Sequence, residues 1–311
     1  MINKIKIGIP RALLYFRYID LWKTFFEELG YEIFISPQTN KSILQDGVNN
    51  SIDESCLSAK IYMGHVHYLI DKVDYILAPR IVSYGKNEVV CTKFNAMYDI
   101  VHNTYRGIKL LDYNVDVLEN KSEFIAYLRM GKVLGSNYIS SLRAYLKGKK
   151  IQELAEAEKG KEQDKLLSTD KLKLLIVSHA YNIYDGLIGK PIIKYLESLE
   201  VIPIYADRAS KALTSQKSEL ISNTLYWTYN KELLGAIEYY KDRVDGIIFI
   251  TTFPCGPDSL VNELCIRKIK TIPITNIVLD ELQGETGLQT RIESFVDILS
   301  EKKKRRDTGN G

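Results

Sequence analysis

The sequence repeats one pattern of strands and helices, and this repeat limits the folds that are open to the chain. KIKIGIP at residues 4–10 leads through a helical pattern to GYEIFIS, and KLKLLIV at residues 171–177 leads through another to EVIPIYA. KVDYILAPR and RVDGIIFIT follow at nearly constant offsets, 167 positions for Lys4 and Lys171 and 171 positions for Val73 and Val244. Apolar runs that alternate with amphipathic helices are typical of parallel βαβ units. The sequence therefore predicts an α/β fold of two Rossmann-like or flavodoxin-like open parallel-sheet domains facing across a cleft.

A charged stretch separates the two halves. It is dense in Lys, Glu, Asp and Gln, and it is typical of an exposed helix or a linker. We expect a first α/β domain at residues 1–150, a charged helix or linker at 151–172 and a second α/β domain at 173–300. Residues 301–311 carry five Lys or Arg against two acids, which predicts a disordered basic tail.

Composition excludes several classes of protein. The chain has no run of about 18 apolar residues that would span a membrane. Its N-terminus enters a strand pattern without the apolar core of a signal peptide, which predicts a cytoplasmic protein. The last eleven residues account for the net charge of +3, and the body shows no basic stripe for binding nucleic acid.

A cysteine follows the most apolar strand of the second half. Cys255 comes after the run at residues 247–252, on a turn formed by Pro254, Gly256 and Pro257. A helix is expected next, from Leu260 to Ile269 with Asp258 or Ser259 as its cap. The positive end of a helix favours a thiolate. The alternative is a small residue in a tight turn that happens to be Cys.

Two more cysteines occupy comparable places in the first half. Cys56 is predicted in the first turn of a helix capped by Asp53 or Ser55, and Cys91 follows the third strand of its half after a loop over residues 80–91. Because ligands bind beyond the carboxyl ends of parallel strands, the three thiols can converge if the halves face each other. Three thiols suit an iron–sulfur cluster, whereas structural zinc usually has four ligands in paired short spacings. The alternative is that the cysteines are buried packing residues.

Other polar residues are candidates for lining such a site. Arg11 follows the first strand and can bind an anionic group, and His179 follows the first strand of the second half. Lys60 and Lys93 each follow a cysteine and can balance the charge of a thiolate or a cluster. The remaining candidates lie near the last two predicted strands of the second half: Asp258, Asp280, Glu281, Glu285 and Arg291. For these residues, solvated surface positions or helix caps are the alternative interpretation.

Five motifs together resemble the acyl-CoA dehydratase activase-related family. They are IGIPRALLYFRY, DESCLSAK, NEVVCTKF, FPCGPDSLVNEL and DELQGETGLQTRIESFVDIL. That family is related to the iron–sulfur subunits of 2-hydroxyacyl-CoA dehydratases and to double-cubane-cluster proteins. The resemblance implies an iron–sulfur cluster bound by Cys56, Cys91 and Cys255. It also implies an ATP-dependent activator with its own cluster that delivers low-potential electrons.

The leading hypothesis is therefore a [4Fe-4S] protein that accepts low-potential electrons for the reduction or radical dehydration of a small substrate, such as an acyl-CoA. This chain has no phosphate-binding loop of the form G-x-x-x-x-G-K-[ST], so ATP hydrolysis is assigned to the partner. Two alternatives stay open. One is a non-catalytic electron relay or regulatory partner, and the other is a metal-free α/β binding module. A paralogous subunit or a second copy of the chain is a further expected partner.

Overall fold

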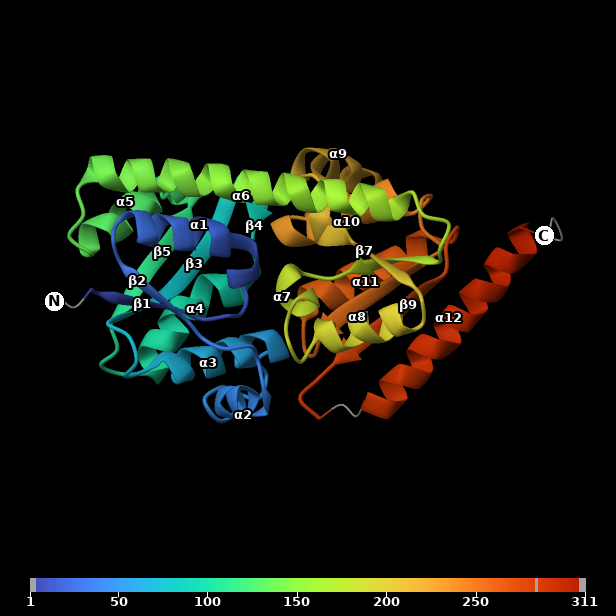
Figure 1. The fold of residues 1–311 in the computed structure, drawn as a ribbon, viewed down its shortest axis with the longest axis horizontal. Coiled ribbons are helices and arrows are strands. Elements are labelled where there is room, and N and C mark those ends of the chain that lie inside the picture. Colours follow the sequence, from blue (N-terminus) through green and yellow to red (C-terminus); the bar gives the residue numbers. More distant parts are fainter. Residues whose placement is uncertain (1–3, 283–284, 308–311) are drawn as a thin grey trace. The chain divides into compact units, whose positions relative to one another are not determined.

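The computed structural model describes residues 4–282 and 285–307, with Glu285, Thr286 and Asp307 described by their backbone alone. The chain divides into two compact units (Figure 1). The first contains residues 1–157 together with residues 226–228, and the second contains residues 158–225 and 229–311. Each unit is an α/β assembly around its own open, mainly parallel sheet, which confirms the predicted fold class of two Rossmann-like domains.

The first unit contains the elements from β1 to α5 and α6 as far as residue 157. They are β1 (Lys6–Ile9), α1 (Tyr15–Glu28), β2 (Glu32–Ile35), α2 (Lys41–Asn49), α3 (Leu57–Leu69), β3 (Tyr75–Gly85), β4 (Glu88–Val89), α4 (Thr92–Thr104), β5 (Leu110–Asp116), a 3-10 turn (Val117–Glu119), α5 (Glu123–Val133) and α6 (Tyr138–Leu167). Strands β2, β1, β3 and β5 run parallel in that order, and the short β4 pairs antiparallel with β3. The apolar strands Ile7–Ile9 and Ile76–Ala78 form the centre of this unit's core.

The predicted loop over residues 80–91 is wrong for its first half. β3 continues past Pro79 as far as Gly85, and Arg80 and Ile81 stay in register with Asn114 and Val115 of β5. The chain then turns back through β4, whose Val89 pairs with Trp227. Pro79 is tolerated because proline removes only one backbone N–H donor from the strand. The pairing of β3 with β5 continues on both sides of it.

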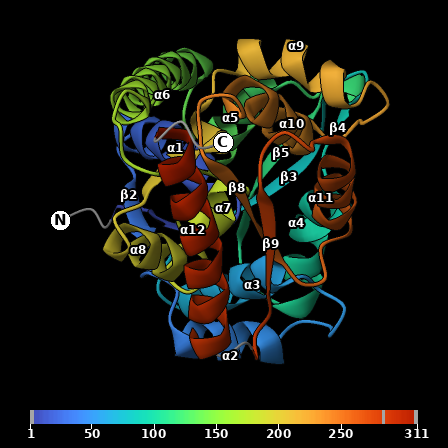
Figure 2. The same cartoon turned by 90° about the vertical axis from the view of Figure 1, so that its right-hand side faces the viewer.

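The second unit repeats the parallel arrangement. Its elements are β6 (Lys173–Val177), α7 (Ala180–Ile183), α8 (Gly189–Ser198), β7 (Ile202–Tyr205), a 3-10 turn (Ala206–Arg208), α9 (Lys211–Ile221), α10 (Thr228–Tyr240), β8 (Gly246–Thr252), α11 (Gly256–Lys268), β9 (Ile274–Leu279) and α12 (Glu285–Asp307). The strand order is β7-β6-β8-β9, and every pair is parallel. Every residue of β8 is buried, as its unbroken apolar run predicts. α12 lies alongside this sheet (Figure 2), with Leu299 and Phe295 packed against Gly246.

The repeat extends to individual hydrogen bonds. In the first unit Asp74 accepts a hydrogen bond from the backbone N–H of Lys6 at 2.7 Å. In the second unit Asp245 accepts one from the backbone N–H of Lys173 at 2.9 Å. Each aspartate belongs to a Val-Asp pair just before the third strand of its unit. The sequence repeat therefore reflects the same carboxylate joining the first and third strands of each sheet.

Two predicted segments are more regular than expected. Residues 138–167 form one continuous helix, α6, which contains most of the expected charged helix or linker at 151–172. The predicted disordered tail is wrong for residues 301–307, because these residues complete α12. Lys303 and Arg306 there form ion pairs with Asp245 at 3.5 and 2.6 Å. Residues 308–311 lie outside the described part of the chain. Among the helices described, none is long and apolar enough to cross a membrane.

Candidate functional site

Three cysteines share one structural position. Cys56, Cys91 and Cys255 are the N-cap residues of α3, α4 and α11, and each is half-buried. The expected caps at Asp53 or Ser55 and at Asp258 or Ser259 are therefore wrong, because each helix begins directly after its cysteine. A group at a helix N-cap lies next to backbone N–H groups that have no partner within the helix, and the helix dipole favours negative charge there. The helix N-terminus at each of the three cysteines therefore favours a thiolate.

Cys56 and Cys91 belong to neighbouring helix N-termini in the first unit. The Nζ atom of Lys93, two residues after Cys91, donates to Oγ of Ser55, the residue before Cys56, at 3.1 Å. This bond joins the start of α4 to the start of α3. Two of the three predicted thiols therefore lie in the same part of the first unit, with the Lys93 ammonium beside them.

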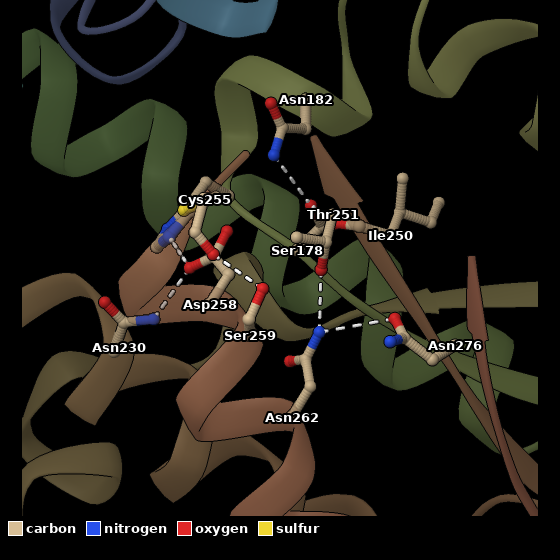
Figure 3. Close-up of polar contacts among 11 residues, drawn as sticks. Ser178, Asn182, Asn230, Ile250, Thr251, Cys255, Asp258, Ser259, Asn262 and Asn276 are labelled. Atoms are coloured by element: carbon tan, nitrogen blue, oxygen red, sulfur yellow. Dashed lines mark hydrogen bonds and ion pairs between the residues drawn. The ribbon is translucent and has the colours of Figure 1, made fainter. Parts of the chain in front are cut away.

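Cys255 belongs to a buried polar cluster in the second unit. It follows β8, and α11 then brings Asp258 back beneath it (Figure 3). Asp258 Oδ1 accepts hydrogen bonds from Nε2 of His179 and from Nδ2 of Asn230, both at 2.8 Å. The Cys255 thiol also donates to this carboxylate. His179 and Asp258 are 7% and 5% exposed, so this contact is shielded from water.

The charge of Asp258 is stabilised by its partners. Burial alone would raise the pKa of this carboxyl, but the His179 ring and the hydrogen bonds from His179, Asn230 and Cys255 outweigh burial. The pKa of Asp258 is consequently held below its ordinary value. An ionised carboxylate is thus fixed next to the Cys255 thiol and orients that thiol at the start of α11. Its negative charge opposes the loss of the thiol proton, whereas the helix N-terminus favours that loss.

The cluster lies where parallel sheets bind ligands. β6 and β8 are neighbours in the sheet, and the chain leaves them toward opposite edges, to β7 and to β9. His179 follows β6, and Cys255 and Asp258 follow β8, so all three lie at the carboxyl ends of these two strands. This is the position at which open α/β sheets bind ligands.

A second set of buried polar groups lies along the same strands (Figure 3). Asn262 of α11 donates to Thr251 at 2.6 Å and to Asn276 of β9 at 3.3 Å. Asn182 of α7 donates to Ser178 at 3.2 Å. The bonds of Asn262 join α11 to β8 and β9, and the bond of Asn182 holds α7 against the end of β6.

Arg11 and Lys60 are further predicted site residues of the first unit. Arg11 follows β1 as expected, with its guanidinium 5.5 Å from the ring centroid of Tyr15. Its Nε is buried and has no hydrogen-bond partner among the described residues. Lys60 is only 4% exposed, within α3, so it is no solvated surface residue.

The predicted polar group at the end of the second sheet is spread over several positions. Asp280 is exposed and accepts from the backbone N–H of Leu282 at 2.8 Å, and Glu281 beside it is half-buried. Arg291 is exposed and donates to the backbone oxygen of Asn276 at 2.8 Å. The side chain of Glu285 lies outside the described residues. The Arg291 bond joins α12 to β9, and neither bond leads to Cys255.

Cys265 is a packing residue, as predicted. It is fully buried in α11, and burial raises the pKa of its thiol to about 12. Such a thiol stays protonated at neutral pH.

Sequence reasoning missed a buried histidine in the first unit. His65 of α3 is fully buried, with Nδ1 2.8 Å from Oγ of Ser36 and Nε2 2.9 Å from Oγ1 of Thr39. Burial and the charge of Arg11 lower the pKa of His65 to about 3. Its ring is therefore neutral at physiological pH. Its place on the apolar side of α3, among Tyr62, Val66 and Leu69, is the signal that could have shown it to be buried.

Within residues 4–282 and 285–307, no group of three or more His, Cys, Asp or Glu side chains is already arranged to hold a metal ion.

Comparison with known proteins decides the family. The family model described as CoA enzyme activase uncharacterised domain (DUF2229) matches residues 6–208, which is more than half of the chain. The chain belongs to this family. The match confirms the resemblance to activase-related proteins. It includes Cys56 and Cys91, and it ends before Cys255.

The other comparisons do not refine the family assignment. No curated protein matches the chain. Among solved structures, ZnuA is 8% identical with a TM-score of 0.28, over 99% of this chain and 100% of that one. The substrate-binding protein FpvC from P. aeruginosa, in complex with Ni²⁺, is 12% identical with a TM-score of 0.29, over 89% and 87%. Similarity this low carries no argument about fold or function.

Proposed function

We propose that this member of the CoA enzyme activase family is an iron–sulfur protein whose ligands are Cys56, Cys91 and Cys255. The observation that carries the proposal is the shared N-cap position of the three thiols. Nothing in helix formation requires Cys at an N-cap, where Ser, Thr, Asp and Asn are preferred. The same unusual choice at three helices therefore favours a common chemical role.

The donor set fits such a cluster. Thiolates are the ligands that iron–sulfur clusters prefer, and a helix N-terminus stabilises the thiolate form that binds. The Lys93 ammonium at the Cys56 and Cys91 helix ends adds positive charge next to an anionic group. Structural zinc would ordinarily need a fourth protein ligand. When bound, a [4Fe-4S] cluster with three cysteine ligands supplies one-electron chemistry and one iron without a protein thiolate.

The polar cluster of the second unit holds Cys255 in place for this role. Asp258 is fixed by His179 and Asn230, and it accepts the hydrogen bond of the Cys255 thiol. Binding of a metal requires the thiol to lose that proton. Asp258, His179 and Asn230 then surround the ligand Cys255 without binding the metal themselves. Neighbours of this kind orient the ligands in metal sites.

We further propose that the protein receives low-potential electrons from an ATP-dependent activator and uses them in the reduction or radical dehydration of a small substrate, an acyl-CoA among the candidates. The family description, which refers to activation of CoA enzymes, supports this direction. An electron relay between such proteins is the alternative within the same proposal. Turnover of acyl-CoA in the presence of the activator distinguishes an enzyme from a relay.

Iron and sulfide analysis tests the proposal. Protein purified without oxygen is expected to hold about four irons and about four sulfides per chain. Cys56→Ser, Cys91→Ser and Cys255→Ser are each expected to lower both contents, and the matched control Cys265→Ala is expected to keep them. Absence of iron from anaerobically purified and reconstituted wild-type protein contradicts the proposal and leaves a metal-free binding module.

A further inference from the structure

The first half of α6, the long green helix of Figure 1, has an exposed face with several apolar side chains. The other side of the helix packs on α1, where a Cβ on Gly148 would lie 2.9 Å from the backbone oxygen of Leu21. On the exposed face Ile139 and Leu146 are 67% and 55% exposed. Exposed residues recur there every three or four positions, the spacing of one helix face, and they are Ile139, Leu142, Leu146, Lys150, Glu153 and Ala157. A continuous exposed face of this kind indicates an interaction surface.

The charge of this segment changes sign near its middle. Residues 139–150 carry four Lys or Arg and no acid, and residues 151–158 carry three Glu and no base. Lys147 and Lys149 form ion pairs with other residues of the same chain, whereas Arg143 forms none within the described residues. The face thus has a basic end and an acidic end. Two copies of it that run in opposite directions bring unlike charges together.

The apolar positions show the same self-complementarity. The side chains of Leu142 and Leu154 are equally spaced about residue 148, and both are exposed. In an antiparallel pair with its two-fold axis at the level of residue 148, Leu142 of one copy lies opposite Leu154 of the other. Arg143 then lies opposite Glu153 of the second copy. A parallel pair would instead place like charges against each other at every step.

We propose that the protein self-associates through α6, which pairs antiparallel with α6 of a second copy. Each copy contributes the same patch, as in two-fold symmetric dimers. The apolar side chains supply the contact, and Arg143 with Glu153 of the second copy fixes the direction. The paired segment, residues 139–157, is about 28 Å long and buries less than a standard interface of about 1,600 Å², so we expect a dissociation constant on the order of micromolar. The surface contains no cysteine, so the inference does not depend on the iron–sulfur proposal.

Sedimentation equilibrium of the full-length protein tests this proposal. The measurement uses a thiol reductant to exclude disulfide-linked dimers and low ionic strength to limit screening of the charges. The monomer has a mass of 35.6 kDa, and we expect the mass to double as the concentration rises. Leu142→Ser is expected to weaken self-association about tenfold, because the symmetric dimer loses the apolar contact twice. The matched control Leu220→Ser replaces an exposed leucine of α9 and is expected to keep the wild-type affinity.

Exchange of the charges tests the antiparallel direction. Arg143→Glu and Glu153→Arg are each expected to weaken self-association about tenfold or more, because each replaces two attractive contacts by repulsive ones. A chain with both substitutions, or an equimolar mixture of the two variants, is expected to recover the wild-type affinity.

Three outcomes overturn the proposal. The first is a wild-type protein that stays monomeric up to about 100 μM, and the second is an unchanged affinity in both single charge variants. The third is a wild-type monomer that binds phosphatidylglycerol vesicles and loses this binding in Arg143→Glu. That result would assign the face to an anionic lipid surface in place of a second copy.

Discussion

Nε2 of His179 lies 2.8 Å from Oδ1 of Asp258, and both side chains are buried. The two residues are 79 positions apart in the sequence. Their contact joins the end of β6 to the first turn of the helix that follows β8. It also connects the Cys255 thiol, which donates to Asp258, to the core of the second unit.

Asp258→Asn tests the contribution of this carboxylate to stability. The folded-state pKa of Asp258 is lower than the ordinary 3.8, so its contribution is complete well above that value and is lost as the pH falls through the folded pKa. We expect the variant to lose about 2 kcal/mol of unfolding free energy at about pH 7, and less at about pH 3. Urea unfolding at the two pH values measures the difference.

Asp280→Asn is the matched control for that experiment. Asp280 is exposed, and its carboxylate accepts only a local backbone N–H within the described chain. The control is expected to change stability by less than about 0.5 kcal/mol at both pH values. If Asp258→Asn costs the same at low and at neutral pH, the ionised form of Asp258 is not what stabilises the cluster.

The burial of His65 predicts that the free energy of unfolding also depends on pH over a second range. Its folded-state pKa of about 3 is far below the ordinary 6.5, so the unfolded chain takes up a proton at this residue over a pH range in which the folded chain does not. Stability from this residue is therefore present above about pH 6.5, and falls as the pH drops toward 3, by up to about 1.4 kcal/mol per pH unit. His65→Gln is expected to flatten the dependence of unfolding free energy on pH over this range.

His67 supplies the control, since it lies on the same helix and is exposed. His67→Gln is expected to keep the wild-type slope. Identical slopes for wild type and His65→Gln would show that the imidazole of His65 is not held neutral by burial between Ser36 and Thr39.

Helices α2 and α3 approach closely at two glycines. A Cβ on Gly64 would lie 1.9 Å from the backbone oxygen of Ile43, and one on Gly47 would lie 2.0 Å from that of Lys60. Gly64→Ala must therefore push the two helix backbones apart, and we expect a loss of about 2–3 kcal/mol in thermal or urea unfolding.

Gly160 of α6 is the comparison for that variant. A Cβ there would meet no atom within 4 Å. Gly160→Ala is expected to raise stability by about 0.5–1 kcal/mol, because Ala is the better helix former. Equal effects of the two substitutions would contradict the close packing of α2 on α3.

Much of the fold could be predicted from apolar patterning. The runs at residues 6–9, 173–177 and 246–252 are central strands, and the repeated Val-Asp pair marks the same position in both sheets. The extension of β3 past Pro79 could not be predicted, because its pairing with β5 is a long-range contact that overrides the local signal of a proline.

The candidate site was predictable in part. Cys255 could be placed near a helix N-terminus from the apolar run before it, and Cys56 from the capping residues beside it. The N-cap positions depend on where each helix begins, which sequence defines poorly. The hydrogen bond between His179 and Asp258 joins residues from distant elements. The sequence could place each at a strand end, but their pairing follows from the order of β6 and β8 in the sheet.

The central claim is that three thiols share one iron–sulfur cluster, and cysteine alkylation under strict exclusion of oxygen tests it most directly. Mass spectrometry would measure the modification rate of each cysteine in iron-loaded protein and after removal of iron by a chelator. The account predicts that Cys56, Cys91 and Cys255 are protected together with iron and become reactive together without it, while buried Cys265 stays unreactive in both states. Alkylation of any of the three at the same rate with and without iron would contradict the account.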